Sequence, residues 1–191
     1  MKSSKTNWKY FIVFIICTGV LTLLDQLTKI AAVSELKEKK PFVIIDGVFE
    51  FYYLENTGTA WGMFGGGRYV FLVLTVIVLA VLCFLALKMP LTKKYMPLHI
   101  VLILVASGAV GNFIDRLSLG YVRDFIYFKL INFPVFNVAD IYVTISIFSL
   151  AFMILFVYEE EDFYFLGFGR KKKDDSIGNR DTGNSGDDEN I

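Results

Sequence analysis

Four long apolar stretches constrain the fold of this chain more than any other feature of its sequence. They cover residues 10–32, 69–87, 98–117 and 138–158. A helix needs about 20 residues to cross the hydrocarbon core of a bilayer, and each stretch reaches that length. Because a backbone in lipid must satisfy its hydrogen bonds internally, we expect four transmembrane helices.

The composition supports a membrane protein and excludes several other classes. Of the 191 residues, 55% are hydrophobic, more than a soluble domain of this size buries. The formal net charge is zero, so we expect no nucleic-acid partner. Cys17 and Cys83 lie inside apolar runs and are predicted to be packing residues. His99 is the only histidine, too few for a His-based zinc site or a Ser-His-Asp triad.

The first apolar stretch follows several lysines, as a secretory signal peptide would. It is too long for the apolar region of such a peptide, and Asp25 and Lys29 follow before any small-residue cleavage site. We therefore expect a permanent helix. Eleven of the nineteen basic residues then fall on one side of the membrane: Lys2, Lys5, Lys9, Lys88, Lys93, Lys94, Arg170, Lys171, Lys172, Lys173 and Arg180. Basic flanks favour the cytoplasm, so both termini are predicted to be cytoplasmic.

The first outer loop is predicted to contain a small β-sheet. Residues 42–45 and 48–54 read as two strands around the turn residues Asp46 and Gly47. The expected fold class is therefore mainly α and integral to the membrane, with an extracytoplasmic sheet inserted at about residues 34–64. Residues 1–158 would form the membrane domain, and residues 159–191 a cytoplasmic tail that is largely disordered.

Polar side chains inside membrane helices are costly, so we expect them to mark a functional site. Asp25 lies about 22 Å along its helix from Tyr10, near the outer boundary. In the third stretch, five residues share one helix face through spacings of three and four: Gly108, Gly111, Asn112, Asp115 and Arg116.

Two further aspartates border the membrane at the same depth. Asp124 follows the third stretch in the outer loop, and Asp140 opens the fourth, three residues after Asn137. Two carboxylates close together in a half-desolvated site cannot both ionise, so they share a proton. One can take a proton from water while the other polarises a scissile carbonyl. This is aspartic peptidase chemistry, and the coupled pair leaves the two roles unassigned between Asp124 and Asp140.

Each candidate also has a structural explanation. Asn137 fits a helix N-cap with Asp140 as an acidic first-turn residue, and Asp124 fits an exposed loop ion pair with Arg123. Asp25 with Lys29, and Asp115 with Arg116, fit ion pairs within a bundle. Gly108 and Gly111 fit close helix contacts, and residues 62–67 fit a hinge.

An ordered set of motifs favours the catalytic interpretation. They are DQLTK at 25–29, ENTGTAWG at 55–62, GNFIDRL at 111–117, GYVRDF at 120–125 and FNVAD at 136–140. In order and spacing over residues 8–158, the chain resembles bacterial lipoprotein signal peptidase, also called signal peptidase II. Thr59 and Trp61 depart from the usual Ala and Phe of that family, so we expect a different fit of substrate or inhibitor near this loop.

The resemblance implies an activity and a set of site residues. Family members cut diacylglyceryl-modified prolipoproteins before the lipidated cysteine, without a metal or organic cofactor. The catalytic pair would be Asp124 and Asp140. The substrate-binding positions would be Asn56, Gly58, Asn112, Arg116 and Asn137, supported by Asp25, Lys29 and Asp115. The expected partners are prolipoproteins and membrane lipid, and the expected form is a monomer in the cytoplasmic membrane with its site toward the extracytoplasmic face.

Two other function classes remain as alternatives. A small ion-coupled transporter would use Asp25, Asp115 and Asp140 as a relay, but the cytoplasmic halves of the stretches are almost purely apolar. A non-enzymatic adaptor would bind a partner strand at the edge of the outer sheet and would tolerate replacement of both Asp124 and Asp140.

Overall fold

The computed structural model describes residues 8–58 and 67–166. The chain forms two compact units, residues 1–158 and 159–191. The second contains the short 3-10 helix η4 (Glu160–Leu166). The four long helices and the sheet belong to the first. The departures at Thr59 and Trp61, the glycine hinge before residue 67 and the predicted disorder beyond residue 173 lie outside the described residues.

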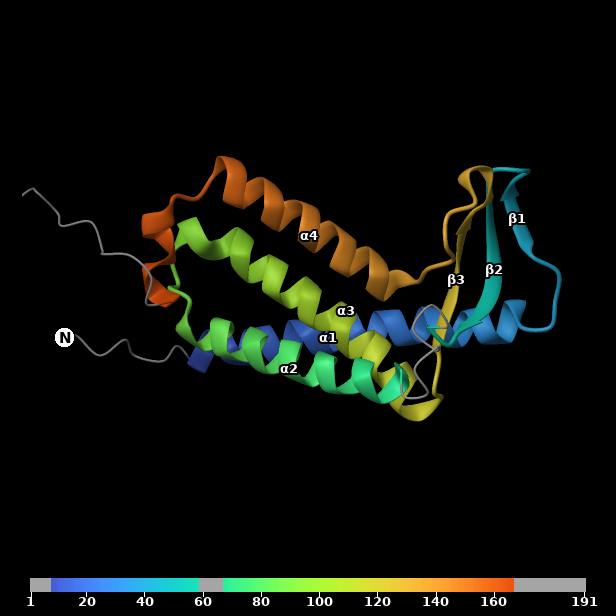
Figure 1. Ribbon diagram of the computed structural model, residues 1–191, viewed down its shortest axis with the longest axis horizontal. Helices are drawn as coiled ribbons and strands as arrows, with labels where there is room; N and C mark the ends of the chain where they lie inside the picture. Colours follow the sequence, from blue (N-terminus) through green and yellow to red (C-terminus); the bar gives the residue numbers. More distant parts are fainter. Residues whose placement is uncertain (1–7, 59–66, 167–191) are drawn as a thin grey trace, which may run out of the picture. The chain divides into compact units, whose positions relative to one another are not determined.

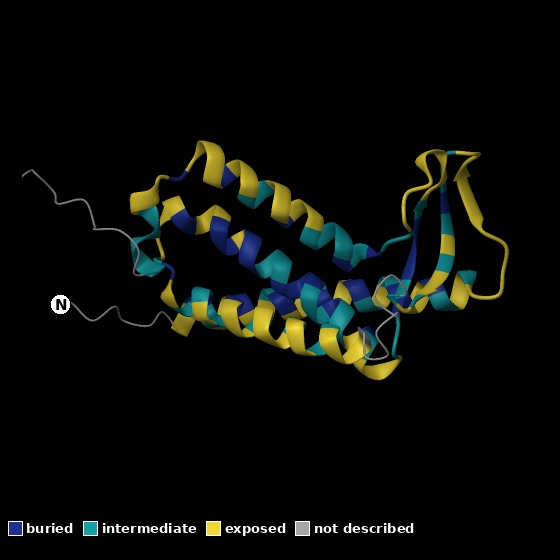
Figure 2. Cartoon of the chain, in the orientation of Figure 1, coloured by how far each residue is buried: buried dark blue, intermediate teal, exposed yellow. Residues whose placement is uncertain are grey.

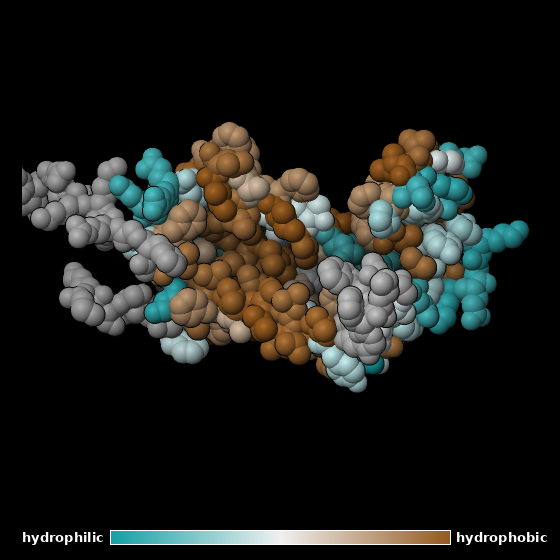
Figure 3. All heavy atoms as spheres, in the orientation of Figure 1, coloured by the Kyte–Doolittle hydropathy of each residue, from teal (hydrophilic) through white to brown (hydrophobic). Residues whose placement is uncertain are grey.

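Four helices in the described residues are long and apolar enough to cross a membrane, as predicted. They are α1 (Trp8–Leu36), α2 (Gly67–Lys88), α3 (Met96–Ser118) and α4 (Val138–Phe156) (Figure 1). Their outward faces carry exposed apolar side chains, and Figure 3 shows hydrophobic residues covering much of the visible bundle. Such a surface is stable in lipid rather than in water.

The helix α3 occupies the middle of the bundle and packs against α1, α2 and α4. It carries more buried residues than its neighbours, as Figure 2 shows. Small residues permit this close approach: a Cβ added to Gly108 would lie 2.5 Å from the Ala139 carbonyl oxygen of α4. The prediction that Gly108 and Gly111 serve close helix packing is confirmed.

A three-stranded antiparallel sheet adjoins one end of the bundle, in the order β1-β2-β3. The strands β1 (Phe42–Ile45) and β2 (Phe49–Asn56) form the predicted hairpin, and Gly47 in its turn has a φ of +69°. The third strand, β3 (Val122–Phe128), was not predicted. The expectation that Asp124 lies in a loop is therefore wrong: Asp124 pairs with Leu54 across the ladder.

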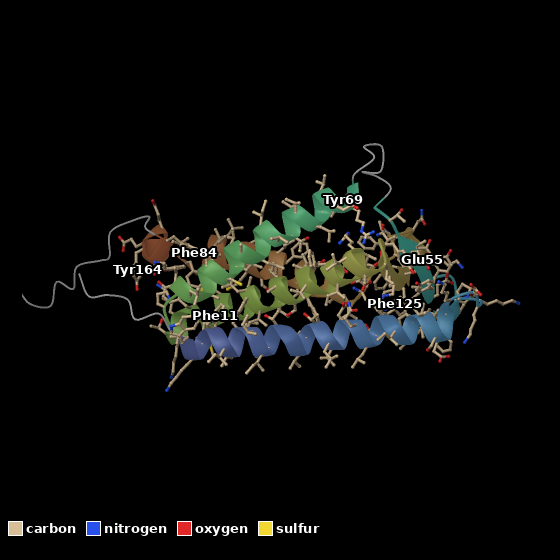
Figure 4. The ribbon with its side chains drawn as sticks, turned by 90° about the horizontal axis from the view of Figure 1, so that it is seen from below. Phe11, Glu55, Tyr69, Phe84, Phe125 and Tyr164 are labelled. Atoms are coloured by element: carbon tan, nitrogen blue, oxygen red, sulfur yellow. The ribbon has the colours of Figure 1, made fainter. Side chains whose placement is uncertain are left out.

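The sheet is held to the bundle by a small apolar core. Ala32 near the end of α1 packs with Phe125 and Ile126 of β3, all three buried. Figure 4 shows Phe125 beside the sheet-side end of α1. This contact fixes β3 next to the ends of the helices, and it brings the strand's aspartate to the mouth of the bundle.

Candidate active site

The two candidate catalytic aspartates come from two neighbouring elements. Asp124 lies on β3 and is only 1% exposed, and Asp140 lies in the first turn of α4, where it is half-buried. Asn137 joins them. Its side-chain Nδ2 donates to Asp124 Oδ1 at 2.6 Å, and its backbone N–H donates to Asp140 Oδ2 at 3.0 Å. The structure thus brings the two predicted carboxylates to one residue.

The position of Asn137 follows from its role as the N-cap of α4. Its side-chain oxygen accepts the Asp140 backbone N–H at 3.1 Å, while Asp140 accepts the Asn137 N–H. These reciprocal bonds form a capping box, which satisfies two backbone donors at the helix start. The predicted N-cap is confirmed. It also orients both aspartates, so the capping role and the proposed catalytic role are compatible.

Asn56 at the end of β2 contacts the other oxygen of Asp124. Its Nδ2 donates to Asp124 Oδ2 at 2.8 Å, and its Oδ1 accepts the backbone N–H of Gly58 at 2.9 Å. Gly58 has a φ of +69°, a conformation that favours glycine. The turn therefore fixes which end of the Asn56 amide faces the carboxylate.

Asn112 on α3 serves Asp140 in the same way. Its Nδ2 donates to Asp140 Oδ1 at 2.8 Å. Its Oδ1 accepts from Lys29 Nζ at 2.9 Å and from Asn137 Nδ2 at 3.2 Å. Because a lysine ammonium only donates, it sets the orientation of the Asn112 amide.

A buried ionic cluster lies beneath these amides. Asp25, Lys29 and Asp115 are all 0% exposed. Lys29 Nζ lies 2.9 Å from Asp25 and 3.6 Å from Asp115. Arg123 completes the cluster, donating to both oxygens of Asp115 at 2.6 and 3.1 Å. Buried charges need such partners, and this cluster balances two acids with two bases.

This cluster corrects two sequence interpretations and adds one residue to the site. The alternative that Arg123 pairs with Asp124 is wrong, because Arg123 pairs with Asp115. Asp115 likewise finds its partners in Lys29 and Arg123 rather than in Arg116. The predicted Asp25–Lys29 pair is confirmed. Gln26 was not predicted as a site residue, but its side chain bonds to Asp115 and Arg123. Its polar side chain, next to Asp25 in an apolar stretch, is the sequence signal that could have identified it.

Arg116 lies on α3 at the edge of the aspartate pair. Its guanidinium sits over the ring of Phe71 on α2, 4.7 Å from the centroid. It also interacts electrostatically with Asp140 and Asp124. A planar cation held by a ring beside two carboxylates is suited to binding a peptide carbonyl.

Burial dominates the electrostatics of Asp124. Removal from water raises the pKa of this carboxyl to about 6, against the opposing hydrogen bond from Asn56. The negative charge of Asp140 also contributes to this raised pKa. A carboxyl with such a pKa holds or releases a proton near neutral pH, as acid–base chemistry requires.

Comparison with known proteins places this chain in a family. The sequence model described as signal peptidase (SPase) II matches residues 17–156. The chain belongs to the signal peptidase II family. It is therefore a membrane protease, and the aspartic type fits this family. The resemblance seen in the motifs is confirmed.

Curated relatives in the signal peptidase II family cover most of the chain. A lipoprotein signal peptidase of Streptococcus thermophilus (strain CNRZ 1066) is 39% identical over 139 residues, covering 73% of this chain and 88% of that protein. One from Streptococcus pyogenes serotype M5 (strain Manfredo) is 37% identical over 152 residues, covering 78% of this chain and 95% of that protein.

Two solved structures share the fold. Both are bacterial membrane enzymes determined by the in meso method, at 1.9 and 2.3 Å resolution. The first has a TM-score of 0.67 and 28% identity, covering 76% of this chain and 94% of that one. The second has a TM-score of 0.64 and 29% identity, covering 75% and 87%. The overall fold therefore has counterparts in solved bacterial membrane enzymes.

Proposed function

We propose that this protein is an aspartic endopeptidase that removes signal peptides from diacylglyceryl-modified prolipoproteins, cutting before the lipidated cysteine. The observation that carries the proposal is Asn137, whose side chain and backbone hold Asp124 and Asp140 at one point. The curated relatives named lipoprotein signal peptidase support the substrate class. The lipid chains would stay in the bilayer while the peptide bond reaches the carboxylates.

The roles of the two aspartates follow from their surroundings. Asp124 is the more buried, and its raised pKa suits the member that holds the shared proton. Substrate binding expels more water and raises that pKa again. Asp140, which is better exposed to water, is then the carboxylate that takes a proton from the attacking water.

The reaction then proceeds with balanced protons. The water oxygen bonds to the scissile carbonyl carbon as Asp140 takes a water proton, and Asp124 gives its proton to the carbonyl oxygen. In the second step the C–N bond breaks, and Asp140 gives its proton to the leaving cysteine nitrogen. The new carboxyl group returns a proton to Asp124, which restores the starting pair.

The asparagines divide into binding and positioning groups. Asn56 and Asn112 each use one Nδ2 hydrogen on an aspartate, which leaves the second for a substrate carbonyl. Asn137 uses both Nδ2 hydrogens, on Asp124 and Asn112. Asn137 is therefore assigned to positioning, and Arg116 and the Gly58 turn to the substrate side of the site.

The proposed location is the cytoplasmic membrane, with both termini in the cytoplasm. The sheet and the aspartate pair would then lie at the extracytoplasmic face, where translocated lipoprotein precursors present their cleavage sites. The excess of basic residues in the flanks and in the α2–α3 connection supports this orientation. We propose that the protein acts as a monomer.

The test compares a lipidated precursor peptide with its unlipidated twin, both analysed by mass after incubation with purified protein. We expect cleavage before the modified cysteine in the lipidated peptide alone. Asp124→Asn and Asp140→Asn should each lower the rate by at least about 1,000-fold, because either change removes half of the acid–base pair.

The matched control is Asp46→Asn, which removes an exposed aspartate from the hairpin turn. It should keep wild-type activity. Full activity in either dyad variant would refute the proposed mechanism, and equal cleavage of both peptides would refute the substrate class.

A further inference from the structure

An apolar cavity of about 540 Å³ lies where the sheet-side end of α1 meets β1, apart from the aspartate pair. Phe125 forms part of its wall. Consecutive side chains on a strand point to opposite faces, so Phe125 and its neighbour Asp124 serve different surfaces of β3. Its lining also includes Thr28, Ala31, Glu35, Lys39 and Lys40.

The cavity continues the lipid-facing surface of α1. Val20, Leu24, Thr28 and Ala31 follow one another at spacings of four and three, so they share a helix face. Val20 is 53% exposed and Leu24 48% exposed within the membrane span. Thr28 turns its hydroxyl to the Asp25 carbonyl at 2.7 Å. An acyl chain along this face would therefore run into the cavity without meeting an unpaired polar group.

The rim of the cavity carries two lysines and one acid. Lys39 Nζ donates to the Ser34 carbonyl at 2.9 Å and lies 3.7 Å from Glu35, so one of its three N–H groups remains. Lys40 is exposed, and within residues 8–58 and 67–166 it has no ion-pair partner. The three side chains carry a net positive charge at the end of an apolar wall.

We propose that this cavity binds one anionic phospholipid, with an acyl chain along α1 and the phosphate between Lys39 and Lys40. The apolar wall and cationic rim match the two parts of such a lipid. The exposed apolar strand β1 beside the rim keeps the site at the membrane surface, where headgroups lie. Because Phe125 adjoins Asp124, a bound lipid would pack against the strand that holds the aspartate.

Native mass spectrometry of the full-length protein in neutral detergent tests the proposal, with dioleoyl phosphatidylglycerol and dioleoyl phosphatidylcholine as probes. We expect one tightly bound phosphatidylglycerol. Lys39→Gln with Lys40→Gln should lower its affinity about 25-fold, since each lysine near an anionic headgroup contributes about fivefold. Binding of phosphatidylcholine should be weaker and unaffected by the double change.

Two matched controls separate the cavity from the general surface. Lys37→Gln removes an equal charge nearby, but Lys37 bonds to Glu55 and does not line the cavity; phosphatidylglycerol should still bind. Ala31→Trp should fill the cavity and abolish binding, whereas Ile30→Trp, on an exposed neighbour outside the lining, should not.

Four results would overturn the proposal. The first is equal affinity for the two lipids, and the second is retention of phosphatidylglycerol by the double lysine variant or by Ala31→Trp. The third is full displacement of phosphatidylglycerol by glycerol 3-phosphate, which would indicate a phosphate site without an acyl chain. The fourth is a dimer that Ala31→Trp disperses, which would assign the cavity to a second copy.

Discussion

At the scale of single residues, Asn137 connects folding to chemistry. Its side-chain oxygen caps α4, its amide hydrogens go to Asp124 and Asn112, and its backbone N–H goes to Asp140. Each bond restricts the others, so the amide has one orientation. The two aspartates are consequently held by the same group that starts the helix.

The pKa of Asp124 should respond in opposite directions to its two neighbours. Asp140→Asn removes a nearby negative charge, so the pKa should fall below about 6. Asn56→Ala removes a donor that stabilises the carboxylate, so the pKa should rise. A ¹³C NMR titration of aspartate carboxyl carbons measures both, with the Asp124 signal identified by its loss in Asp124→Asn.

The raised pKa of Asp124 also predicts how stability and activity depend on pH. A carboxyl whose folded pKa lies above its unfolded value binds protons more tightly when folded, so Asp124 lowers the free energy of unfolding as pH rises from about 4 to about 6. The alkaline limb of the pH profile of kcat/KM should shift to higher pH in Asn56→Ala, by the same amount as the pKa of Asp124 measured by NMR. An unchanged pKa in both variants would contradict the assignment of Asp124 as proton holder.

At the scale of elements, the close approach of α3 to α1 and α4 sets the depth of Asn112. A Cβ on Gly111 would lie 2.5 Å from Asp25 Oδ2 and 3.3 Å from the Ala139 Cβ. The glycine thus lets α3 contact both a buried acid and the first turn of α4.

Gly111→Ala should separate these helices. We expect the free energy of unfolding to fall by about 1–3 kcal/mol through overpacking, and activity to drop because Asn112 and Asp140 move apart. Gly19→Ala on α1 is the control, since nothing lies within 4 Å of its added Cβ. Thermal unfolding in detergent measures the loss of stability, and precursor cleavage measures the loss of activity. Equal stability and activity of the two variants would contradict the role given to Gly111.

Local patterns predicted the four helices, the hairpin and the N-cap, because each depends on neighbouring residues. The strand β3 was missed because its partner β2 lies far earlier in the chain, and because Arg123 and Asp124 read as an exposed pair. Adjacent side chains on a strand point to opposite faces, so these two cannot pair with each other. The partnership of Arg123 with Asp115 and Gln26 depends on tertiary contacts that spacing does not reveal.

At the scale of the whole molecule, the buried charges among the described residues gather at the sheet end of the bundle. Asp25, Lys29 and Asp115 are buried near the sheet, whereas His99 is buried further along α3 beside Tyr10. A transporter would need polar side chains arranged along the whole path. The arrangement here favours chemistry at a single depth.

The proposed orientation gives a labelling prediction. With Cys17 and Cys83 replaced by alanine, Asp46→Cys in the hairpin turn should react with a membrane-impermeant maleimide in intact cells. Thr92→Cys, exposed in the α2–α3 connection, should react only after permeabilisation. The control is each variant's precursor-cleaving activity, which confirms correct insertion. The reverse pattern would place the sheet in the cytoplasm.

The division of the aspartate pair between β3 and α4 has a consequence for the newborn enzyme. A chain whose third strand has not yet joined the hairpin possesses both acids but no functioning centre. On the proposed mechanism, such a polypeptide cannot cleave precursors while it is still being inserted. On the same mechanism, the joining of β3 to the hairpin would be the step that makes the enzyme active.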